Sequence, residues 1–198
     1  MTFPPLRIAR FVARTEAEGP GIRSALWVQG CTIRCRGCFN PQLWGRHGGE
    51  LVTSQELFQQ VPDDVEGVTL LGGEPFEQPI GLANFARLVK SRGQTVMTFT
   101  GYVLEELRRS CDPGIAALLT YTDLLVDGPF DVTSLDTRRP WVGSVNQRFH
   151  ALTPRYRSLV ASIASIPDRL EVRIGPDGKV AVNGWATSDT LEDLIFGI

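Results

Sequence analysis

Several features that often decide a protein's class are scarce or missing in this sequence of 198 residues. It has four cysteines and two histidines, and no apolar run approaches the roughly 20 residues of a membrane-spanning helix. The net charge of −2 gives no general attraction for nucleic acid or for an anionic membrane. Sparse cysteine and the lack of a signal sequence argue against a disulfide framework. We therefore expect a cytoplasmic protein that binds neither nucleic acid nor a membrane.

The remaining composition is that of an ordinary folded domain. At 42% hydrophobic residues, the chain can bury an ample core without crosslinks. Linkers, internal repeats and low-complexity stretches are not recognisable in the sequence. We predict a single domain over residues 1–198, with a C-terminal extension from about residue 155 to residue 198.

Three of the four cysteines, Cys31, Cys35 and Cys38, lie within eight residues, directly after an apolar segment. This spacing lets three thiolates from one loop, residues 30–46, converge on a single centre. Three thiolates can hold three corners of a 4Fe–4S cube and leave the fourth iron without a protein ligand, whereas an electron-transfer cluster usually takes four cysteines. An open iron can bind a small molecule, so this pattern indicates a cluster with a chemical role.

Other interpretations of the cysteine loop compete with this one. His47 could complete a Cys3His zinc site, which would be typical of a binding module without turnover. A redox dithiol of Cys35 and Cys38 would leave Cys31 unused, and Gly37 does not favour the helix N-terminus that such a dithiol needs. From the loop alone, the cluster and zinc interpretations both stay open.

A second motif, Gly72-Gly73-Glu74-Pro75, follows a short apolar segment at residues 66–71. Two glycines let the backbone come close to a ligand and can adopt positive φ. Glu74 offers a carboxylate to an ammonium group, and Pro75 stiffens the turn. Taken alone, the motif is more typical of an ordinary turn between a strand and a helix, and it indicates a ligand site only beside the cysteine loop.

Apolar periodicity and capping residues predict strands that alternate with helices. We predict strands at residues 6–13, 24–29, 66–71, 94–99 and 123–126, helices at 54–60, 80–91, 103–109, 113–120 and 154–166, then a strand pair at 170–174 and 179–182 and a short helix from about residue 188. This alternation predicts an α/β fold with a parallel sheet and outer helices, in which ligands bind at the C-terminal ends of the strands. Both motifs fall there, as do Thr100 and Asp127.

Taken together and in this order, the motifs resemble the radical S-adenosylmethionine (SAM) superfamily. The closer resemblance is to the small activating enzymes of glycyl radical enzymes, above all the activators of anaerobic ribonucleotide reductase. Besides the two motifs above, it rests on residues 19–23, 29–31, 38–41, 100–102, 126–130 and 143–148. The resemblance implies a partial (β/α)6 barrel and a radical SAM oxidoreductase.

The resemblance also implies the cofactors and the chemistry. Cys31, Cys35 and Cys38 would hold a 4Fe–4S cluster, and its open iron would chelate the amino and carboxylate groups of SAM. After reduction by a one-electron donor such as flavodoxin or ferredoxin, the cluster would cleave SAM reductively. The resulting 5′-deoxyadenosyl radical would take a hydrogen atom from the substrate. No catalytic residue beyond the cluster ligands is required.

Further SAM contacts follow from the same resemblance. Gly72, Gly73 and Glu74, in the turn that ends with Pro75, would receive the amino group of SAM. Many members of the superfamily carry an aromatic residue just before the third cysteine, near the adenine. Gly37 occupies that position here, so Phe39 or the backbone would supply the contact.

For five other residues the resemblance implies roles that compete with simpler ones. Thr100 and Asp127 would bind the SAM carboxylate or a monovalent cation, but a plain turn and a cap are equally open. Ser144, Asn146 and Gln147 would bind the ribose or the carboxylate of SAM, although they could also cap their own loop.

The sequence leaves the hydrogen donor open. The first hypothesis is the backbone glycine of a partner glycyl radical enzyme, since the chain lacks an Arg-Val-x-Gly-Tyr segment of its own. The second is a peptide or small metabolite that is modified directly, for which the C-terminal extension leaves room. The third is a zinc- or cluster-binding interaction module without turnover.

Overall fold

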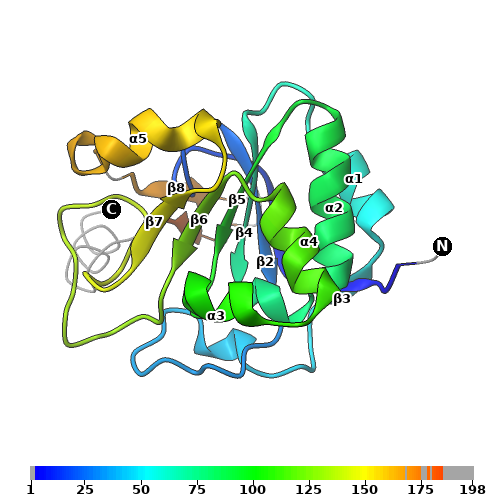
Figure 1. Ribbon diagram of the computed structural model, residues 1–198, viewed down its shortest axis with the longest axis horizontal. Coiled ribbons are helices and arrows are strands. Elements are labelled where there is room, and N and C mark those ends of the chain that lie inside the picture. The colour runs from blue at the N-terminus through cyan, green and yellow to red at the C-terminus, as the bar shows by residue number, and fades with distance from the viewer. Residues whose placement is uncertain (1–2, 168, 175–177, 179, 185–198) are drawn as a thin grey trace.

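In the computed structural model, which describes residues 3–167, 169–174, 178 and 180–184, seven strands form one sheet (Figure 1). Their order is β3-β1-β2-β4-β5-β6-β7. Along the chain they are β1 (Leu6–Thr15), β2 (Arg23–Val28), β3 (Glu50–Val52), β4 (Gly67–Gly72), β5 (Thr95–Phe99), β6 (Leu124–Asp127) and β7 (Arg148–Ala151). Strands β2, β4, β5 and β6 run parallel. The predicted α/β fold is confirmed for this central part.

The edges of the sheet differ from the prediction, because β1, β3 and β7 are each antiparallel to their neighbours. Strand β1 joins β2 through a short turn without a helix, and a parallel pair would need a long crossover connection. Strands β3 and β7 were not predicted. They are short, and their residues are exposed or half-buried, so no apolar run marks them.

The helices are α1 (Ser54–Gln60), α2 (Pro79–Ser91), α3 (Leu104–Arg109), α4 (Pro113–Tyr121) and α5 (Arg157–Ala161). Helices α1, α2 and α4 pack together on one side of the sheet, and α5 lies beside β7 (Figure 1). A separate antiparallel hairpin consists of β8 (Glu171–Ile174) and β9 (Val180–Asn183), as predicted. Within the described part of the chain, no helix combines the length and hydrophobicity needed to cross a bilayer.

Helix α2 joins the helical layer to the sheet. Its buried apolar side chains recur at helical spacing, at Leu82, Phe85, Ala86 and Val89. They belong to one cluster with buried residues of β4 and β5. Full burial of such a side chain contributes about 1.5–3 kcal/mol. The core thus fixes the sheet from this side and leaves the C-terminal ends of its strands free to carry loops.

The helix predicted at residues 154–166 is broken into pieces. Two short 3-10 turns, Pro154–Tyr156 and Ile163–Ser165, flank α5, which has only five residues. At the break, the Ser162 hydroxyl donates to the Ser158 carbonyl at 3.1 Å, and serine is a poor helix former. No residue of α5 is buried, so packing does not extend the helix. The helix predicted from about residue 188 lies outside the described residues.

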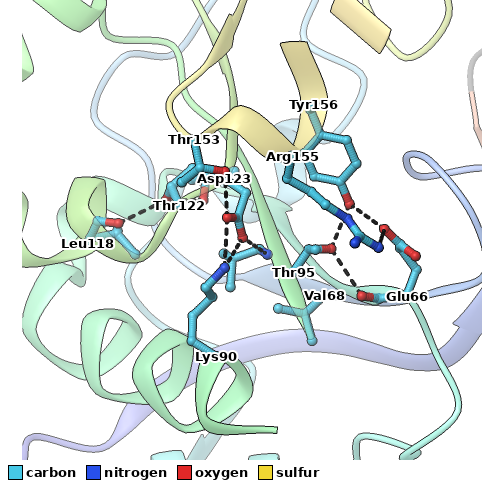
Figure 2. Close-up of polar contacts among 12 residues, drawn as sticks. Glu66, Val68, Lys90, Thr95, Leu118, Thr122, Asp123, Thr153, Arg155 and Tyr156 are labelled. Carbon is cyan, nitrogen blue, oxygen red and sulfur yellow. Dashed lines mark hydrogen bonds and ion pairs between the residues drawn. The ribbon is translucent and has the colours of Figure 1, made fainter. Parts of the chain in front are cut away.

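The N-terminal ends of β5 and β6 are joined by a buried carboxylate (Figure 2). Asp123 accepts hydrogen bonds from the Lys90 ammonium at 2.7 Å and from the Val96 N–H at 2.9 Å. The Thr153 hydroxyl donates to the same carboxylate at 2.9 Å. A buried charge is stable only when it is paired and hydrogen-bonded in this way.

A fully buried arginine joins the same ends of β2 and β4. The Arg23 guanidinium donates to the Thr69 hydroxyl at 2.9 Å and to the Tyr156 hydroxyl at 3.1 Å. Tyr156 in turn donates to Glu66 at 3.0 Å (Figure 2). Burial lowers the pKa of Arg23, and these neutral partners satisfy its donors. This polar layer lies at the opposite ends of the strands from the cysteine loop.

Candidate functional site

The cysteine loop, residues 30–46, leaves β2 and returns to its end. The N–H of Gly30 donates to the Leu43 carbonyl at 2.8 Å, and the N–H of Cys31 donates to the Trp44 carbonyl at 3.1 Å. These two bonds close the base of the loop. Its cysteines are therefore held beside the sheet, although the loop contains only a single 3-10 turn, Pro41–Leu43.

The three cysteines are half-buried free thiols and line one cavity of about 140 Å³. Burial raises the pKa of Cys31 and of Cys35. A metal ion reverses this tendency, since a coordinating thiol loses its proton outright. Within the loop, the Cys38 N–H donates to the Cys35 carbonyl at 3.2 Å, and the Asn40 N–H points to the Cys38 sulfur at 3.4 Å.

A further part of the cavity wall comes from the C-terminal ends of the parallel strands. Gly72, Gly73 and Glu74 contribute from the end of β4, Thr100 from the end of β5 and Gly128 from the end of β6. The prediction that the motifs converge at these strand ends is confirmed.

The donor set can be compared with what a cluster and a zinc ion each require. Among the described residues, no three side chains of the metal-binding types lie close enough to hold one metal ion. The Cys3His arrangement with His47 is therefore not assembled. A 4Fe–4S cube has no such requirement, because each cysteine sulfur binds a different iron. Three thiols around a shared cavity fit the cube.

The two glycines of the Gly-Gly-Glu-Pro motif are required by packing against β2. Gly72 has φ 107°, and a Cβ there would lie 2.6 Å from the Cα of Trp27. A Cβ on Gly73 would lie 2.2 Å from the carbonyl oxygen of Gly30. The N–H of residue 73 donates to the carbonyl of Val28, the last residue of β2, and the N–H of residue 74 donates to the Gly30 carbonyl, both at 2.8 Å. The glycines thus hold the motif against the start of the cysteine loop.

Glu74 is buried and joins the ends of β4 and β5. Its carboxylate accepts hydrogen bonds from the Thr100 hydroxyl at 2.8 Å and from the Gly101 N–H at 2.9 Å. The N–H of Phe76, in the 3-10 turn that Pro75 begins, donates to it at 2.9 Å. Burial outweighs these bonds and raises the pKa of Glu74 to about 7. The hydroxyl of Thr100 is therefore directed to Glu74.

The raised pKa of Glu74 predicts that stability falls as the pH rises. Between pH 4.5 and about 7, the folded protein keeps a proton that the unfolded chain has already released. Over this range we expect wild-type cluster-free protein to lose about 3 kcal/mol of unfolding free energy relative to Glu74→Gln. Denaturant titrations at pH 4.5 to 8 measure this difference. Exposed Glu106→Gln is the control, and equal pH slopes for wild type and Glu74→Gln would contradict the prediction.

Asp127 is buried and makes its contacts to α3 and β7. It accepts hydrogen bonds from the Leu104 N–H at 2.7 Å and from Arg148 Nε at 2.9 Å, and His150 Nε2 lies 3.0 Å from it. Burial raises the pKa of Asp127, but these hydrogen bonds outweigh burial and the pKa is lowered. In the described part of the chain, the cavity wall includes Gly128 but not Asp127. Asp127 caps α3.

The predicted residues between β6 and β7 hold their own loop. The Ser144 hydroxyl accepts from the Asp131 N–H at 3.1 Å, and the Asn146 amide donates to the Pro129 carbonyl at 2.7 Å. The side-chain oxygen Oε1 of Gln147 accepts from the backbone N–H groups of Gly143 and Ser144, at 2.9 and 3.2 Å. Of the three, Gln147 also lines the cavity of the cysteines.

A second chamber of about 360 Å³ adjoins the cavity, with Phe130 and Gln147 in both walls. Phe39 lines this chamber rather than the cavity, and its ring centroid lies 5.1 Å from that of Phe130. Trp27 and Trp141 supply further aromatic surface. The site is therefore a pair of connected spaces, one carrying the cysteines and one with an aromatic wall.

Sequence reasoning missed several contributors to the site, among them Phe130, which lines both spaces. Trp44 lines the cavity, and Glu77 accepts hydrogen bonds from the N–H and the hydroxyl of Thr32, both at 2.6 Å. Glu77 follows the Gly-Gly-Glu-Pro motif closely, and Trp44 lies inside the cysteine loop. Closeness to these motifs in the sequence is therefore the signal that could have identified both residues. Neither residue type is diagnostic, because acids and aromatic residues are common in loops.

Comparison with known proteins identifies the family. Residues 17–150 match the model of a 4Fe-4S single cluster domain. The anaerobic ribonucleoside-triphosphate reductase-activating protein of Vibrio cholerae is 35% identical over 148 residues, covering 69% of this chain and 92% of the relative. This chain belongs to the radical SAM activating enzymes. The anaerobic ribonucleoside-triphosphate reductase-activating protein of Enterobacteria phage T4 is 32% identical to this activating enzyme over 144 residues, covering 69% of this chain and 88% of that protein.

Two further similarities are more partial. The pyruvate formate-lyase 1-activating enzyme of Escherichia coli is 35% identical over 128 residues, but the match spans 50% of that protein. Among solved structures, QueE from Escherichia coli overlaps 49% of this chain and 53% of its own, with a TM-score of 0.42 and 18% sequence identity. That likeness is too distant to bear on function.

Membership of the radical SAM activating enzymes resolves the two interpretations of the cysteine loop. The cofactors are a 4Fe–4S cluster and SAM, and the zinc alternative is set aside. The half-buried thiols around one cavity are consistent with this donor set.

Proposed function

We propose that this chain activates a glycyl radical enzyme of the anaerobic ribonucleotide reductase class. The observation that carries the proposal is the match to activating proteins over 148 residues, joined to three cysteines that share a cavity with the Gly-Gly-Glu-Pro turn. Once bound, and with the cluster reduced by one electron, the cofactors would supply a 5′-deoxyadenosyl radical for removal of a hydrogen atom from a backbone glycine of the partner. The protein's own part is to position the cofactors and the hydrogen donor and to exclude water from the site.

Each wall of the cavity has a distinct part in this proposal. Cys31, Cys35 and Cys38 would hold the cluster. The Glu74 carboxylate would face the amino group of SAM, and a positive charge beside it would favour the ionised carboxylate and lower its pKa. Thr100 would act through Glu74, since its hydroxyl donates to that carboxylate.

The remaining predicted residues fall into two groups, those that would contact SAM and those that hold the protein's own helix or loop in place. Phe39 and Gln147 line the chamber beside the cavity, which supports contacts with the adenosyl part of SAM. Asp127, Ser144 and Asn146 make hydrogen bonds within the chain, which supports roles in holding α3 and the loop before β7. A monovalent cation near Asp127 has no support beyond the resemblance.

The chamber would admit the hydrogen donor, because it shares two wall residues with the cofactor cavity. The wall of the chamber also includes Val182, Asn183 and Gly184 of the C-terminal hairpin, and the Gly184 N–H donates to Glu18 at 2.9 Å. This hairpin lies outside residues 17–150, which match the family model. An added wall favours one alternative, a radical SAM enzyme that modifies a peptide or small metabolite directly.

The proposal extends to the fold and the setting of the protein. Four parallel strands with ligand motifs at their C-terminal ends support a partial (β/α)6 barrel. We treat residues 1–198 as one domain. Thiols that must stay reduced support a cytoplasmic location, with flavodoxin or ferredoxin as the electron donor.

The test is anaerobic reconstitution followed by incubation with SAM, dithionite and the anaerobic ribonucleotide reductase of the same organism. We expect a glycyl radical signal on the reductase in EPR spectra, dependent on SAM and on this protein. Formation of 5′-deoxyadenosine without a radical on the reductase would contradict the partner and favour the peptide or metabolite alternative. Absence of 5′-deoxyadenosine would overturn the enzymatic proposal.

A further inference from the structure

Trp44 carries a buried hydrogen-bond donor without an acceptor. Its indole Nε1 is shielded from solvent and forms no hydrogen bond with any residue that the structure describes. Leaving a buried donor unpaired costs about 1–3 kcal/mol. Native proteins rarely accept this cost, and a bound ligand or ion can supply the missing acceptor.

The position of Trp44 connects this donor with the cysteines. The carbonyl of Trp44 accepts the N–H of Cys31 at 3.1 Å, so the residue is held at the base of the cysteine loop. Trp44 also lines the cavity of about 140 Å³ that Cys31, Cys35 and Cys38 line. A bound 4Fe–4S cluster would bring inorganic sulfide into this cavity and would convert the cysteine thiols already there into thiolates, and both kinds of sulfur can accept a hydrogen bond.

We propose that the indole N–H of Trp44 donates a hydrogen bond to a sulfur of the cluster and raises its reduction potential. The proposal rests on the cluster assignment but not on the identity of the partner enzyme. Reduction adds negative charge to the cluster, and an N–H···S bond stabilises that charge more than the oxidised form. Trp44 thereby makes the cluster easier to reduce by one electron.

The variant that tests this is Trp44→Phe, which keeps an aromatic ring in the cavity wall and removes the N–H. After anaerobic reconstitution, iron and sulfide per chain are counted, and the potential is measured by EPR-monitored titration without SAM. We expect full iron content and a more negative potential. A tenfold fall in the ratio of reduced to oxidised cluster at a fixed potential corresponds to about 59 mV, and a shift of that order is expected.

The matched control is Trp141→Phe. Trp141 lines the adjoining chamber and not the cavity of the cysteines, as far as the described residues go. Trp141→Phe makes the same chemical change outside the cavity of the cysteines, and the potential of its cluster, measured without SAM, should equal that of the wild type. An unchanged potential in fully loaded Trp44→Phe would overturn the proposal. A shift seen only with SAM present would also overturn it, by assigning the bond to SAM.

A measurement on the wild type keeps the proposal testable if Trp44→Phe fails to hold iron. Protein labelled with 15N in its tryptophan indoles is reduced and studied by pulsed EPR. In the wild type we expect a hyperfine coupling between the reduced cluster and an indole 15N, and the same coupling should persist in Trp141→Phe. Absence of the coupling from the wild type would refute the hydrogen bond. Neither experiment uses SAM turnover or a partner enzyme. A negative result here therefore does not affect the proposed activation of a glycyl radical enzyme, and failure of the activation test does not affect the proposed hydrogen bond of Trp44.

Discussion

Cys35→Ala is expected to abolish SAM cleavage. The variant keeps two of the three thiols around the cavity, and two ligands leave the cube with two open irons. Loss of a hydrogen-bonding partner behind a metal ligand already costs about 10–100-fold in affinity or activity, so loss of a ligand itself should exceed 100-fold. The measurement is 5′-deoxyadenosine formed with dithionite and SAM after anaerobic reconstitution, together with iron per chain.

The control for this prediction is Cys111→Ala. Cys111 is exposed, between α3 and α4, and removing it subtracts one thiol without touching the cavity. This variant should retain wild-type iron content and 5′-deoxyadenosine formation. Product formation by Cys35→Ala at the wild-type rate would refute the cluster assignment, as would iron loss confined to Cys111→Ala.

Gly73→Ala is expected to destabilise the protein even without cofactors. An alanine Cβ would lie 2.2 Å from the carbonyl oxygen of Gly30, which is backbone and cannot rotate away. The end of β4 would have to separate from the end of β2, breaking the 2.8 Å hydrogen bonds between them. We expect a loss of about 3 kcal/mol or more, at the upper end of overpacking costs. Denaturant unfolding of the cluster-free protein under anaerobic conditions measures it.

Gly93→Ala is the matched control for this substitution. Nothing lies within 4 Å of a Cβ at Gly93, so only its positive φ of 77° is penalised. That strain costs about 1–2 kcal/mol. Gly73→Ala should therefore lose clearly more, and failure to fold is the extreme of the same result. The contradicting outcome would be cluster-free Gly73→Ala that is as stable as the wild type, together with poor SAM binding after reconstitution. The glycine would then be required by the ligand and not by packing.

Most central elements were predictable because their signals are local. Helix α2 begins with a proline and carries apolar residues at helical spacing, and the buried strands are short apolar runs between turns. Strands β3 and β7 have no such signal, since their side chains are exposed or half-buried. Their only reason to be extended is the backbone of β1 or β6 beside them.

The site divides in the same way. Cys31, Cys35 and Cys38 are close in sequence, so their spacing alone indicated a shared centre, and the family match bears out the cluster. By contrast, the bond between Thr100 and Glu74 joins residues on different strands. Its existence depends on β4 and β5 being neighbours, which spacing along the chain does not encode.

By itself, the sequence determined the chemistry this protein is equipped for, because the cysteine loop and the Gly-Gly-Glu-Pro turn each depend on residues only a few positions apart. The tertiary structure decided which side chains remain available to a ligand. Packing of β4 against β2 accounted for the glycines, the pairing of Asp127 with Arg148 gave that acid a partner in the chain, and burial without an acceptor singled out Trp44. These are properties of contacts between distant segments, and hydrogen-bond satisfaction and burial exist only once those segments have come together.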